Sequence, residues 1–344
     1  MQEAPQAPLT TCFVAGHSGG HIIPCITLAD NLREHEPRQT IIFFTTDASL
    51  DRSIMQQHGA IHHVPLPTAR RIPYRNPFKW PWFFLGMIRS WWISFTQLRK
   101  HKPQRLHTTG GLVALPVCMA AWLLRIPIEL HEVNVQPGAT IKLLARFADK
   151  INITYHETET ILQRSCTIAP YPVKYHLHHT QQDPRTARAS LGLDQNRFTI
   201  TILGGSQGSL QLNQLIHAWI HQHPYVHASV QIIHQVGSSQ DVNTWNTFYS
   251  NYNIPSYCFT FRKHLDYIYC ASDYVLSRAG AGTLAELAFF QKKCCIIPLE
   301  LKNNDHQLHN ARAYTKQRAN HALLIRGHEI MKLHQHLTKL VVKP

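Results

Sequence analysis

Acidic residues are scarce in this chain. Only 20 of its 344 residues are Asp or Glu, against 34 Lys or Arg, so the formal net charge is +14 although charged residues make up just 16% of the sequence. Such a balance favours an anionic partner, and nucleic acid and anionic lipid are the two candidates. Because the sequence has no helix-turn-helix pattern and no RNP-like run, we expect no nucleic-acid partner.

Several sequence signals are missing as well. The eight cysteines show no C-x-x-C spacing and most lie in apolar runs, which predicts reduced, buried thiols in a cytoplasmic protein. The polar residues 1–11 do not look like a signal peptide or an anchor. No apolar stretch approaches the roughly 18 to 20 residues that span a bilayer. We expect no metal ligands, and the histidines His176, His178 and His179 are interpreted as part of a solvated linker.

Tryptophan and basic residues are interleaved between positions 69 and 102. Both kinds of side chain suit a membrane interface, where amphipathic rings lie at headgroup depth and cations meet anionic lipid. The same aromatic residues would also suit a helix packed on the core of a first domain, and the two interpretations can share residues. The residues expected at the membrane surface are Trp80, Trp82, Phe83, Phe84, Trp91, Arg75, Lys79 and Arg89.

Short apolar runs alternate with helix-like segments through the whole chain, which predicts parallel sheets in two α/β domains. A polar, proline-containing segment starts near Tyr171 and is interpreted as the hinge, so the domains are 1–171 and 172–344. The last helix, about 329–344, is expected to pack back on the first domain. The predicted strands are 10–15, 40–46, 104–108, 127–131, 150–154, 198–203, 230–235, 257–260, 274–276, 294–297 and 322–325.

A glycine-rich turn follows an apolar run and precedes a helix-like stretch at two places. The first turn holds Gly16, Ser18, Gly19 and Gly20, and the second holds Gly204, Gly205, Ser206 and Gly208. Unpaired N–H groups at the start of a helix can meet phosphate oxygens at the positive end of the helix dipole. Two such units predict two nucleotide-fold domains that face one cleft, with ligands beyond the carboxyl ends of the strands.

Six motifs in this order resemble the MurG family of bacterial N-acetylglucosaminyltransferases. They are AGHSGGH at 15–21, TTGG at 108–111, HEVN at 131–134, LGGSQG at 203–208, SRAGAGTLAE at 277–286 and NDHQLHNA at 304–311. The resemblance covers nearly the whole chain. It implies an α/β protein of the GT-B fold, with two Rossmann-like, doubly wound parallel-sheet domains and a cleft between them.

The same resemblance implies an activity. This is transfer of N-acetylglucosamine from UDP-N-acetylglucosamine to the 4-hydroxyl of MurNAc in undecaprenyl-pyrophosphoryl-MurNAc-pentapeptide, which converts lipid I to lipid II. Transfer is expected to invert the anomeric centre and to need no cofactor; the lack of a D-x-D pair agrees with metal independence. The implied location is the cytoplasmic face of the bacterial inner membrane, as a peripheral protein within a cell-wall synthesis complex.

The resemblance also assigns roles to residues. His21 is the first candidate for the general base and Glu132 the second. The acceptor pyrophosphate is expected at Gly16, Ser18, Gly19, Gly20, Gly110 and Gly111. The expected donor-binding residues are Ser18, Gly19, Gly20, Asn134, Lys174, Ser206, Gln207, Arg262, Ala281, Gly282, Thr283, Glu286, His306, Gln307 and Asn310. Among them, Glu286 is expected at the ribose and Gln307 with Asn310 at the sugar hydroxyls, although these last two could merely cap a turn.

Three residues depart from the family pattern. Lys174 replaces an arginine, Gly282 replaces a larger apolar residue, and Arg262 stands at a usually apolar position beside the uracil. Alternatives remain open, namely another GT-B glycolipid glycosyltransferase or a UDP-N-acetylglucosamine epimerase. A dinucleotide-dependent oxidoreductase would use Asp47 as ribose ligand, but the first turn lacks G-x-G-x-x-G. A membrane-surface binding module without catalysis would need only the tryptophan-rich segment.

Overall fold

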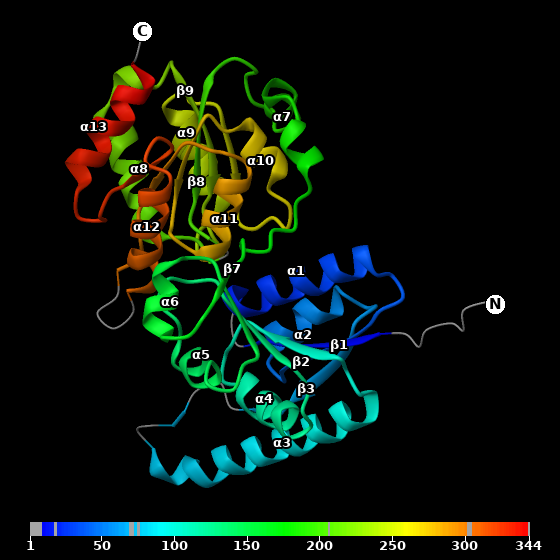
Figure 1. Ribbon diagram of the computed structural model, residues 1–344. Helices are drawn as coiled ribbons and strands as arrows, with labels where there is room; N and C mark the ends of the chain where they lie inside the picture. Colours follow the sequence, from blue (N-terminus) through cyan, green and yellow to red (C-terminus); the bar gives the residue numbers. More distant parts are fainter. Residues whose placement is uncertain are drawn as a thin grey trace, which may run out of the picture. The chain divides into compact units, whose positions relative to one another are not determined.

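The computed structural model describes residues 9–16, 19–68, 72–73, 76–205, 207–300 and 305–342. The chain forms two compact units, residues 1–174 and 175–344 (Figure 1). The boundary falls three residues after the hinge that the sequence predicts. Each unit is built on one parallel sheet.

The first sheet has the strand order β3-β2-β1-β4-β5-β6-β7. Five of these strands confirm predicted runs. Strand β3 was not predicted; it contains Pro65 and lies at an edge of the sheet, where the missing N–H of proline is tolerated. The strands are β1 Thr10–Val14, β2 Thr40–Thr46, β3 His62–Leu66, β4 Arg105–Thr108, β5 Ile128–Glu132, β6 Lys150–Ile153 and β7 Thr167–Ile168. The helices are α1 Gly19–His35, α2 Ser49–Gln56, α3 Trp80–His101, α4 Ala114–Leu123, α5 Ala139–Leu144 and α6 Glu157–Leu162.

The second sheet repeats this topology with the strand order β10-β9-β8-β11-β12-β13, and all six strands confirm predicted runs. The strands are β8 Phe198–Leu203, β9 Val230–Gln235, β10 Ser256–Phe259, β11 Tyr274–Ser277, β12 Cys294–Ile296 and β13 Ala322–Leu324. The helices are α7 Pro184–Ser190, α8 Leu210–Gln222, α9 Val242–Asn251, α10 Asp266–Ala271, α11 Ala281–Phe289, α12 His306–Gln317 and α13 Ile330–Val341.

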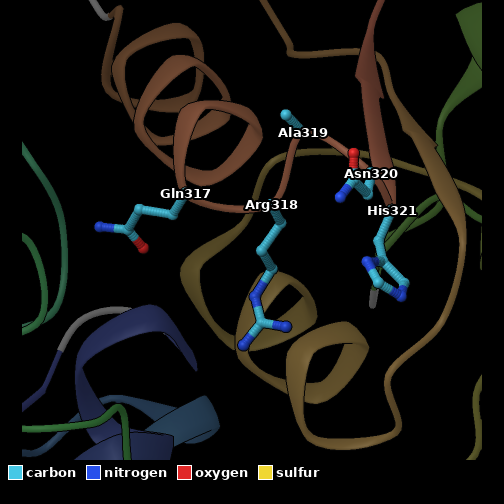
Figure 2. A pocket seen from close by; sticks show the side chains of 5 residues that line it. All are labelled: Gln317, Arg318, Ala319, Asn320 and His321. Atoms are coloured by element: carbon cyan, nitrogen blue, oxygen red, sulfur yellow. The ribbon is translucent and has the colours of Figure 1, made fainter.

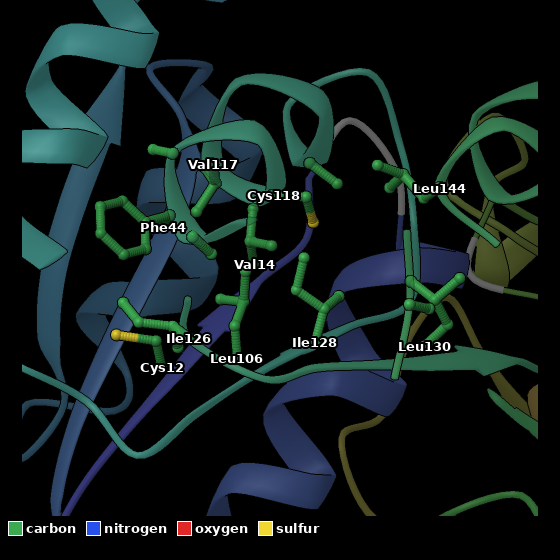
Figure 3. Close-up of a cluster of buried hydrophobic side chains, with 14 of the residues drawn as sticks. Cys12, Val14, Phe44, Leu106, Val117, Cys118, Ile126, Ile128, Leu130 and Leu144 are labelled. Carbon is green, nitrogen blue, oxygen red and sulfur yellow. The ribbon is translucent and has the colours of Figure 1, made fainter. Parts of the chain in front are cut away.

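Alternate residues of the first sheet enter two different cores, as the pleat of a strand requires. Cys12 and Val14 of β1 lie in a cluster with Val117 and Cys118 of α4, and Figure 3 shows these side chains packed together. Phe13 points to the opposite face and packs in a cluster with residues of α1 and α2. The sheet is therefore covered on both faces.

The C-terminal helix α13 packs on the core of the second unit. Its apolar residues Leu333 and Leu337 are buried in a core of the second unit. The indole N–H of Trp219 in α8 donates to Thr338, and Tyr274 of β11 is hydrogen-bonded to His336 at 2.7 Å. The buried face of α13 is therefore used within its own unit.

All eight cysteines are free, and six of them are buried. Burial raises the pKa of the Cys25 and Cys294 thiols to about 12, so both thiols are protonated at neutral pH. The prediction of reduced, buried thiols is confirmed for these six.

Helix α3 packs on the first unit through one narrow stripe. Ser90, Ser94 and Leu98 are buried along it. Gly86 permits a close approach to the strand-end segment below it, because a Cβ there would lie 2.9 Å from the carbonyl oxygen of Pro67. The rest of the helix is largely exposed. Within the described ranges, no helix combines the length and the apolar character that crossing a membrane requires.

We predict that Leu106→Ala lowers the free energy of unfolding by about 2 to 5 kcal/mol, because it removes packed atoms of a fully buried side chain and leaves a cavity. Leu123→Ala, at a side chain that is 55% exposed on α4, is the matched control and should change stability by less than about 0.5 kcal/mol. Urea unfolding followed by circular dichroism measures both. Equal effects would contradict the core assignment.

Candidate active site

Strand order reverses at one point in each sheet. In the first unit β1 lies between β2 and β4, and in the second β8 lies between β9 and β11. Ligands of doubly wound sheets bind at such points, beyond the carboxyl ends of the strands. The first glycine turn follows β1 and the second follows β8. The topology thus places each turn where a ligand is expected.

The turn after β1 lies against the segment that follows β4. A Cβ on Gly111 would lie 3.3 Å from the carbonyl oxygen of Gly16, and Gly111 has a φ of +87° that favours glycine. Gly110 has a φ of +92°, and a Cβ there would lie even closer to its neighbour, 2.9 Å from the side chain of Ile141. Gly19 and Gly20 begin α1, and Ser18 lies outside the described residues. The structure therefore brings Gly16, Gly110 and Gly111 together, as predicted.

His21 is held in one orientation by the same segment. Its Nδ1 lies 2.9 Å from the carbonyl oxygen of Thr109, and the hydroxyl of Thr109 donates to the carbonyl oxygen of His21 at 2.7 Å. Because a carbonyl can only accept, Nδ1 must carry the proton. In the neutral ring the lone pair then lies on Nε2, which is the atom that a general base uses.

Glu132, the second candidate base, is buried in its own loop. It is only 3% exposed, and its Oε1 accepts from the backbone N–H of Asn134 at 2.8 Å and from the Asn134 side-chain amide at 3.1 Å. Desolvation raises the pKa of Glu132 to about 7, against the opposing effect of these hydrogen bonds. The carboxyl group therefore organises the loop that carries Asn134.

The second glycine turn is fixed by a backbone contact. A Cβ on Gly208 would lie 2.4 Å from the Cα of Gly237, and a Cβ on Gly237 would lie 2.3 Å from the Cα of Gly208. Both glycines have positive φ, at +78° and +90°. Gly237 follows β9, and the sequence interpretation missed it because one glycine in a polar stretch carries no signal. Gln207 is exposed beside this contact, and Ser206 lies outside the described residues.

A buried network of hydrogen bonds between polar side chains lies beside this turn. The amide nitrogen of Asn213 donates to the carbonyl oxygen of Val236 at 3.0 Å, so its Oδ1 faces Nε2 of His234 at 3.1 Å. The hydroxyl of Tyr249 lies 2.9 Å from the other ring nitrogen. Burial lowers the pKa of His234 to about 3, so the ring is neutral and bridges the two partners. Each of the three side chains in this network therefore has a hydrogen-bond partner, and none of them is charged.

The N-termini of α8 and α11 differ in one decisive respect. The hydroxyl of Ser209 caps α8 by accepting from the N–H of Leu212. Helix α11 starts after Gly280 and has no side-chain cap, so the first N–H groups, at Ala281, Gly282 and Thr283, are left for another acceptor. Of the two helices, α11 therefore offers the better site for an anion.

Arg278 joins three loops at the carboxyl edge of the second sheet. Its Nε donates to Ser209, its Nη2 donates to Gln211 at 2.9 Å, and its Nη1 donates to the carbonyl oxygens of Ile297 and Pro298. The residue is 7% exposed, and burial lowers the pKa of its guanidinium to about 10. No carboxylate in the described part of the chain pairs with it. Sequence reasoning missed this residue, although it lies within the SRAGAGTLAE motif.

The predicted sugar ligands of α12 mostly support the loop before α11. Oε1 of Gln307 accepts from the N–H groups of Ala279 and Leu299. Asn310 is 1% exposed, and its amide donates to the carbonyl oxygen of Ala279. Both residues therefore contact the loop before α11, and their role at the sugar hydroxyls stays a prediction. His306 begins the same helix and is partly buried.

The remaining predicted donor residues lie around this edge. Glu286, on α11, is partly buried and accepts from the hydroxyl of Tyr269 at 2.8 Å, which orients its carboxylate. Arg262 is exposed and lies over the ring of Tyr257, 5.1 Å from its centroid. Lys174 is exposed at the end of the first unit.

Two surface depressions are formed by described residues, and the smaller one borders the first glycine turn, because a Cβ on Gly16 would lie 3.3 Å from Thr46. The larger, of about 460 Å³, is lined by residues 317–321, which precede β13 (Figure 2). It therefore lies near the amino ends of the parallel strands, where ligands of this architecture do not bind. The other, of about 300 Å³, is lined by Thr46, Asp47, Ala48, Ser49 and Thr68 at the ends of β2 and β3.

Two parallel α/β units with glycine turns at their reversal points define the GT-B class of nucleotide-sugar enzymes. Residues 11–153 match the glycosyltransferase family 28 N-terminal domain, and residues 199–344 match the glycosyltransferase family 28 C-terminal domain. The chain belongs to glycosyltransferase family 28.

Similar proteins share one name, UDP-N-acetylglucosamine--N-acetylmuramyl-(pentapeptide) pyrophosphoryl-undecaprenol N-acetylglucosamine transferase. The protein of this name from Protochlamydia amoebophila is 32% identical over 87% of this chain and 78% of its own. That from Caldicellulosiruptor saccharolyticus is 30% identical over 97% of this chain and 89% of its own. The predicted resemblance is therefore confirmed.

Solved structures agree on the fold. The crystal structure of Acinetobacter baumannii MurG matches with a TM-score of 0.72 at 22% identity, over 97% of this chain and 91% of that one. UDP-GlcNAc 2-epimerase from Neisseria meningitidis, solved bound to UDP-GlcNAc, matches with a TM-score of 0.65 at 12% identity, again over 97% and 91%. At these identities the likeness concerns the fold alone, and it confirms the predicted GT-B architecture.

We predict that Gly237→Ala weakens binding of a uridine diphosphate sugar at least tenfold and lowers the melting temperature, because the new Cβ must push Gly208 out of place. Gly192→Ala is the matched control. It has a φ of +70° but no atom within 4 Å of the new Cβ, so it tests the backbone conformation without the contact. Calorimetric titration measures affinity; equal losses in both variants would refute the role of the contact.

We predict that the free energy of unfolding falls between pH 4.5 and pH 7 through Glu132. In the unfolded chain this carboxyl group loses its proton near pH 4.5, whereas the folded protein keeps the proton until about pH 7. The folded state is thus favoured below pH 4.5 and loses that advantage, on the order of 3 kcal/mol, as pH rises to 7.

Glu132→Gln should remove this slope, because the amide does not titrate and its oxygen can still accept from Asn134. Urea unfolding of both proteins at pH 5 and pH 7.5 gives the difference, in which the other titrating groups cancel. Parallel pH dependences would show that Glu132 is not a buried acid.

Proposed function

We propose that this protein transfers N-acetylglucosamine from UDP-N-acetylglucosamine to the 4-hydroxyl of MurNAc in undecaprenyl-pyrophosphoryl-MurNAc-pentapeptide, converting lipid I to lipid II in peptidoglycan synthesis. The observation that carries this function is the pair of glycine turns at the reversal points of two family 28 domains. The names of the relatives supply the substrates.

The donor binds at the carboxyl edge of the second unit in this proposal. The uncapped N-terminus of α11 faces the diphosphate, and the turn at Gly204 to Gly208 allows its oxygens to approach the backbone. Glu286 accepts from the ribose hydroxyls, as a carboxylate already aligned by Tyr269 can. Arg278 holds three loops of this site in register and adds a positive charge that no carboxylate among the described residues neutralises.

The acceptor binds at the carboxyl edge of the first unit. Its pyrophosphate meets the turn formed by Gly16, Gly110 and Gly111. His21 lies in the first turn of α1, the helix that follows Gly16 in the chain. Nε2 of His21 removes the proton of the 4-hydroxyl while that oxygen bonds to the anomeric carbon. The bond from this carbon to UDP breaks and UDP leaves with the electron pair. A single displacement of this kind inverts the anomeric centre.

The leaving diphosphate gains negative charge in the transition state. Helix N-terminal N–H groups and an aligned guanidinium can stabilise that charge without a metal ion. We therefore propose a metal-independent displacement with no cofactor, in which UDP-N-acetylglucosamine is a substrate.

The oxidoreductase alternative is weakened by one contact. Asp47, which would have to bind a ribose, is paired with Arg52 on the next helix. The carboxylate is thus already engaged.

A basic and aromatic surface on the first unit suits an anionic membrane. Leu85, Ile88 and Trp92 recur at helical spacing along α3 and are 56%, 64% and 59% exposed. Arg89 is exposed on the same helix, Lys79 is exposed directly before it, and Arg75 lies outside the described residues. Trp82 and Phe84 are also exposed, while Trp80, Phe83 and Trp91 are partly buried. Trp91 in fact packs on the core, so it contributes less to this surface than the sequence suggests.

Helices α4 and α5 extend the apolar surface beyond the predicted segment. Met119, Trp122 and Leu123 of α4 are more than half exposed, and Trp122 meets Phe147 edge to face at 6.0 Å. Helix α4 packs beside α3. We propose that this surface holds the enzyme at the cytoplasmic face of the inner membrane, where the lipid-linked acceptor resides and where other cell-wall enzymes can meet it.

We predict that His21→Ala lowers the rate of transfer by roughly 10² to 10⁴, because the acceptor hydroxyl loses its base. Affinity for UDP-N-acetylglucosamine should stay within twofold, since this residue belongs to the other unit. His35→Ala, at an exposed histidine of the same helix, is the matched control and should retain full activity. Turnover with detergent-solubilised lipid I measures the effect; a His21→Ala enzyme within twofold of the parent would exclude this base.

We predict that replacing Leu85, Ile88 and Trp92 with serine weakens binding to phosphatidylglycerol vesicles by roughly tenfold or more, because three apolar side chains no longer insert. The control replaces Phe261 and Met331, which are 62% and 68% exposed on the second unit. Co-sedimentation measures binding, and thermal unfolding verifies that both variants fold. Unchanged sedimentation of the α3 variant would contradict the membrane assignment.

A further inference from the structure

Three side chains of metal-binding types converge on one face of the first sheet. His107 of β4 is the register partner of Glu129 of β5, and His131 lies two residues further along β5 on the same face. Nδ1 of His107 is 3.1 Å from Nε2 of His131 and 3.9 Å from Oε2 of Glu129. One atom of each residue lies within 4.8 Å of the other two.

The two imidazoles are in the form that binds metals. Desolvation lowers the pKa of His107 to about 4 and that of His131 to about 3, so both rings are neutral at pH 7. Two neutral rings in direct contact share a single proton along the line between their nitrogens. A cation placed there can use both lone pairs once the ring that donates this proton takes its other tautomer, with no charged imidazole to displace.

We propose that His107, Glu129 and His131 form a binding site for a divalent transition-metal ion of the zinc class. Zinc takes imidazole nitrogen and carboxylate oxygen at about 2.0 to 2.2 Å in tetrahedral geometry, so its ligand atoms lie roughly 3.3 Å apart. The separation of the two imidazole nitrogens already fits this value. A small rotation of the Glu129 carboxylate brings Oε2 to the same distance, and water completes the fourth position.

Neighbouring side chains can hold the three ligands in the orientation that binds the ion. Oε1 of Glu129 accepts from Arg105 at 2.8 Å, which leaves Oε2 for the ion. The amide of Asn152 lies 3.5 Å from Nδ1 of His131, and with its oxygen turned to the ring it accepts the Nδ1 proton. Lys150 approaches Oε2 at 3.8 Å, but its side chain is 51% exposed and can turn to solvent when the ion binds.

The site has an access route and a structural consequence. The side chains of His107 and Glu129 are 13% and 12% exposed, so the cluster is shielded yet reachable from solvent. An ion there links β4 directly to β5 at the start of the loop that carries Glu132 and Asn134. The inference rests on these residues alone and does not depend on the proposed transfer reaction.

The test compares zinc binding by the full chain and by two single variants. After treatment with EDTA and its removal, each protein is titrated with Zn²⁺ by calorimetry, and bound zinc is counted by elemental analysis. His107→Leu should bind one ion fewer than the parent. His178→Ala, within the exposed histidines of the linker, is the matched control and should keep the high-affinity site. Co²⁺ loading should give a tetrahedral absorption band in the parent that His107→Leu lacks.

A second variant covers the case in which His107→Leu does not fold. Glu129→Gln keeps the size of the side chain and an oxygen for Arg105, and it should weaken Zn²⁺ binding at least tenfold. The proposal is overturned if the parent binds no zinc at micromolar concentrations. It is overturned equally if the parent and both cluster variants bind the same number of ions with the same affinity.

Discussion

The carboxyl edge of the second sheet depends on one buried cation, the guanidinium of Arg278. It donates to the cap of α8, to Gln211 and to two carbonyl oxygens after β12, so one side chain sets the positions of three loops. In the described part of the chain no carboxylate offsets its charge, and burial alone lowers its pKa. A buried cation of this kind is costly unless an anion arrives. Under the proposed function the diphosphate of the donor is such an anion, so its binding would offset the cost of burying this guanidinium.

The two units share the same sheet topology, but the residues beside their glycine turns differ. In each, a glycine turn at the strand reversal packs backbone against backbone, Gly16 with Gly111 and Gly208 with Gly237. In the second unit α11 has no side-chain cap, and the proposed function uses its N-terminus to stabilise a leaving diphosphate. The first unit instead fixes the tautomer of His21 through Thr109, which suits removal of a proton. The different proposed roles of the two units thus follow from the residues next to each glycine turn.

Most of the fold could be predicted from the sequence, because parallel strands buried on both faces read as short apolar runs. The pattern failed at β3, where Pro65 and two histidines occupy an edge strand, and at the two-residue β7. The glycine turns were also predictable. Gly237, Arg278 and the cluster of His107 with His131 were not, because each acts through a partner far away in the sequence. The contacts of Gln307 and Asn310 with Ala279 were not predictable for the same reason, since Ala279 lies about one helix earlier in the chain.

The most direct test of the transfer is the fate of a labelled sugar. The protein is incubated with UDP-N-acetylglucosamine labelled in the sugar and with the undecaprenyl-pyrophosphoryl-MurNAc-pentapeptide acceptor, in the presence of EDTA. We expect one labelled residue to enter the lipid for each UDP released, in a β-1,4 linkage that nuclear magnetic resonance can identify. Label that stays in the nucleotide sugar, as its 2-epimer or unchanged, would contradict the proposed function, and an α-linked product would contradict the single displacement.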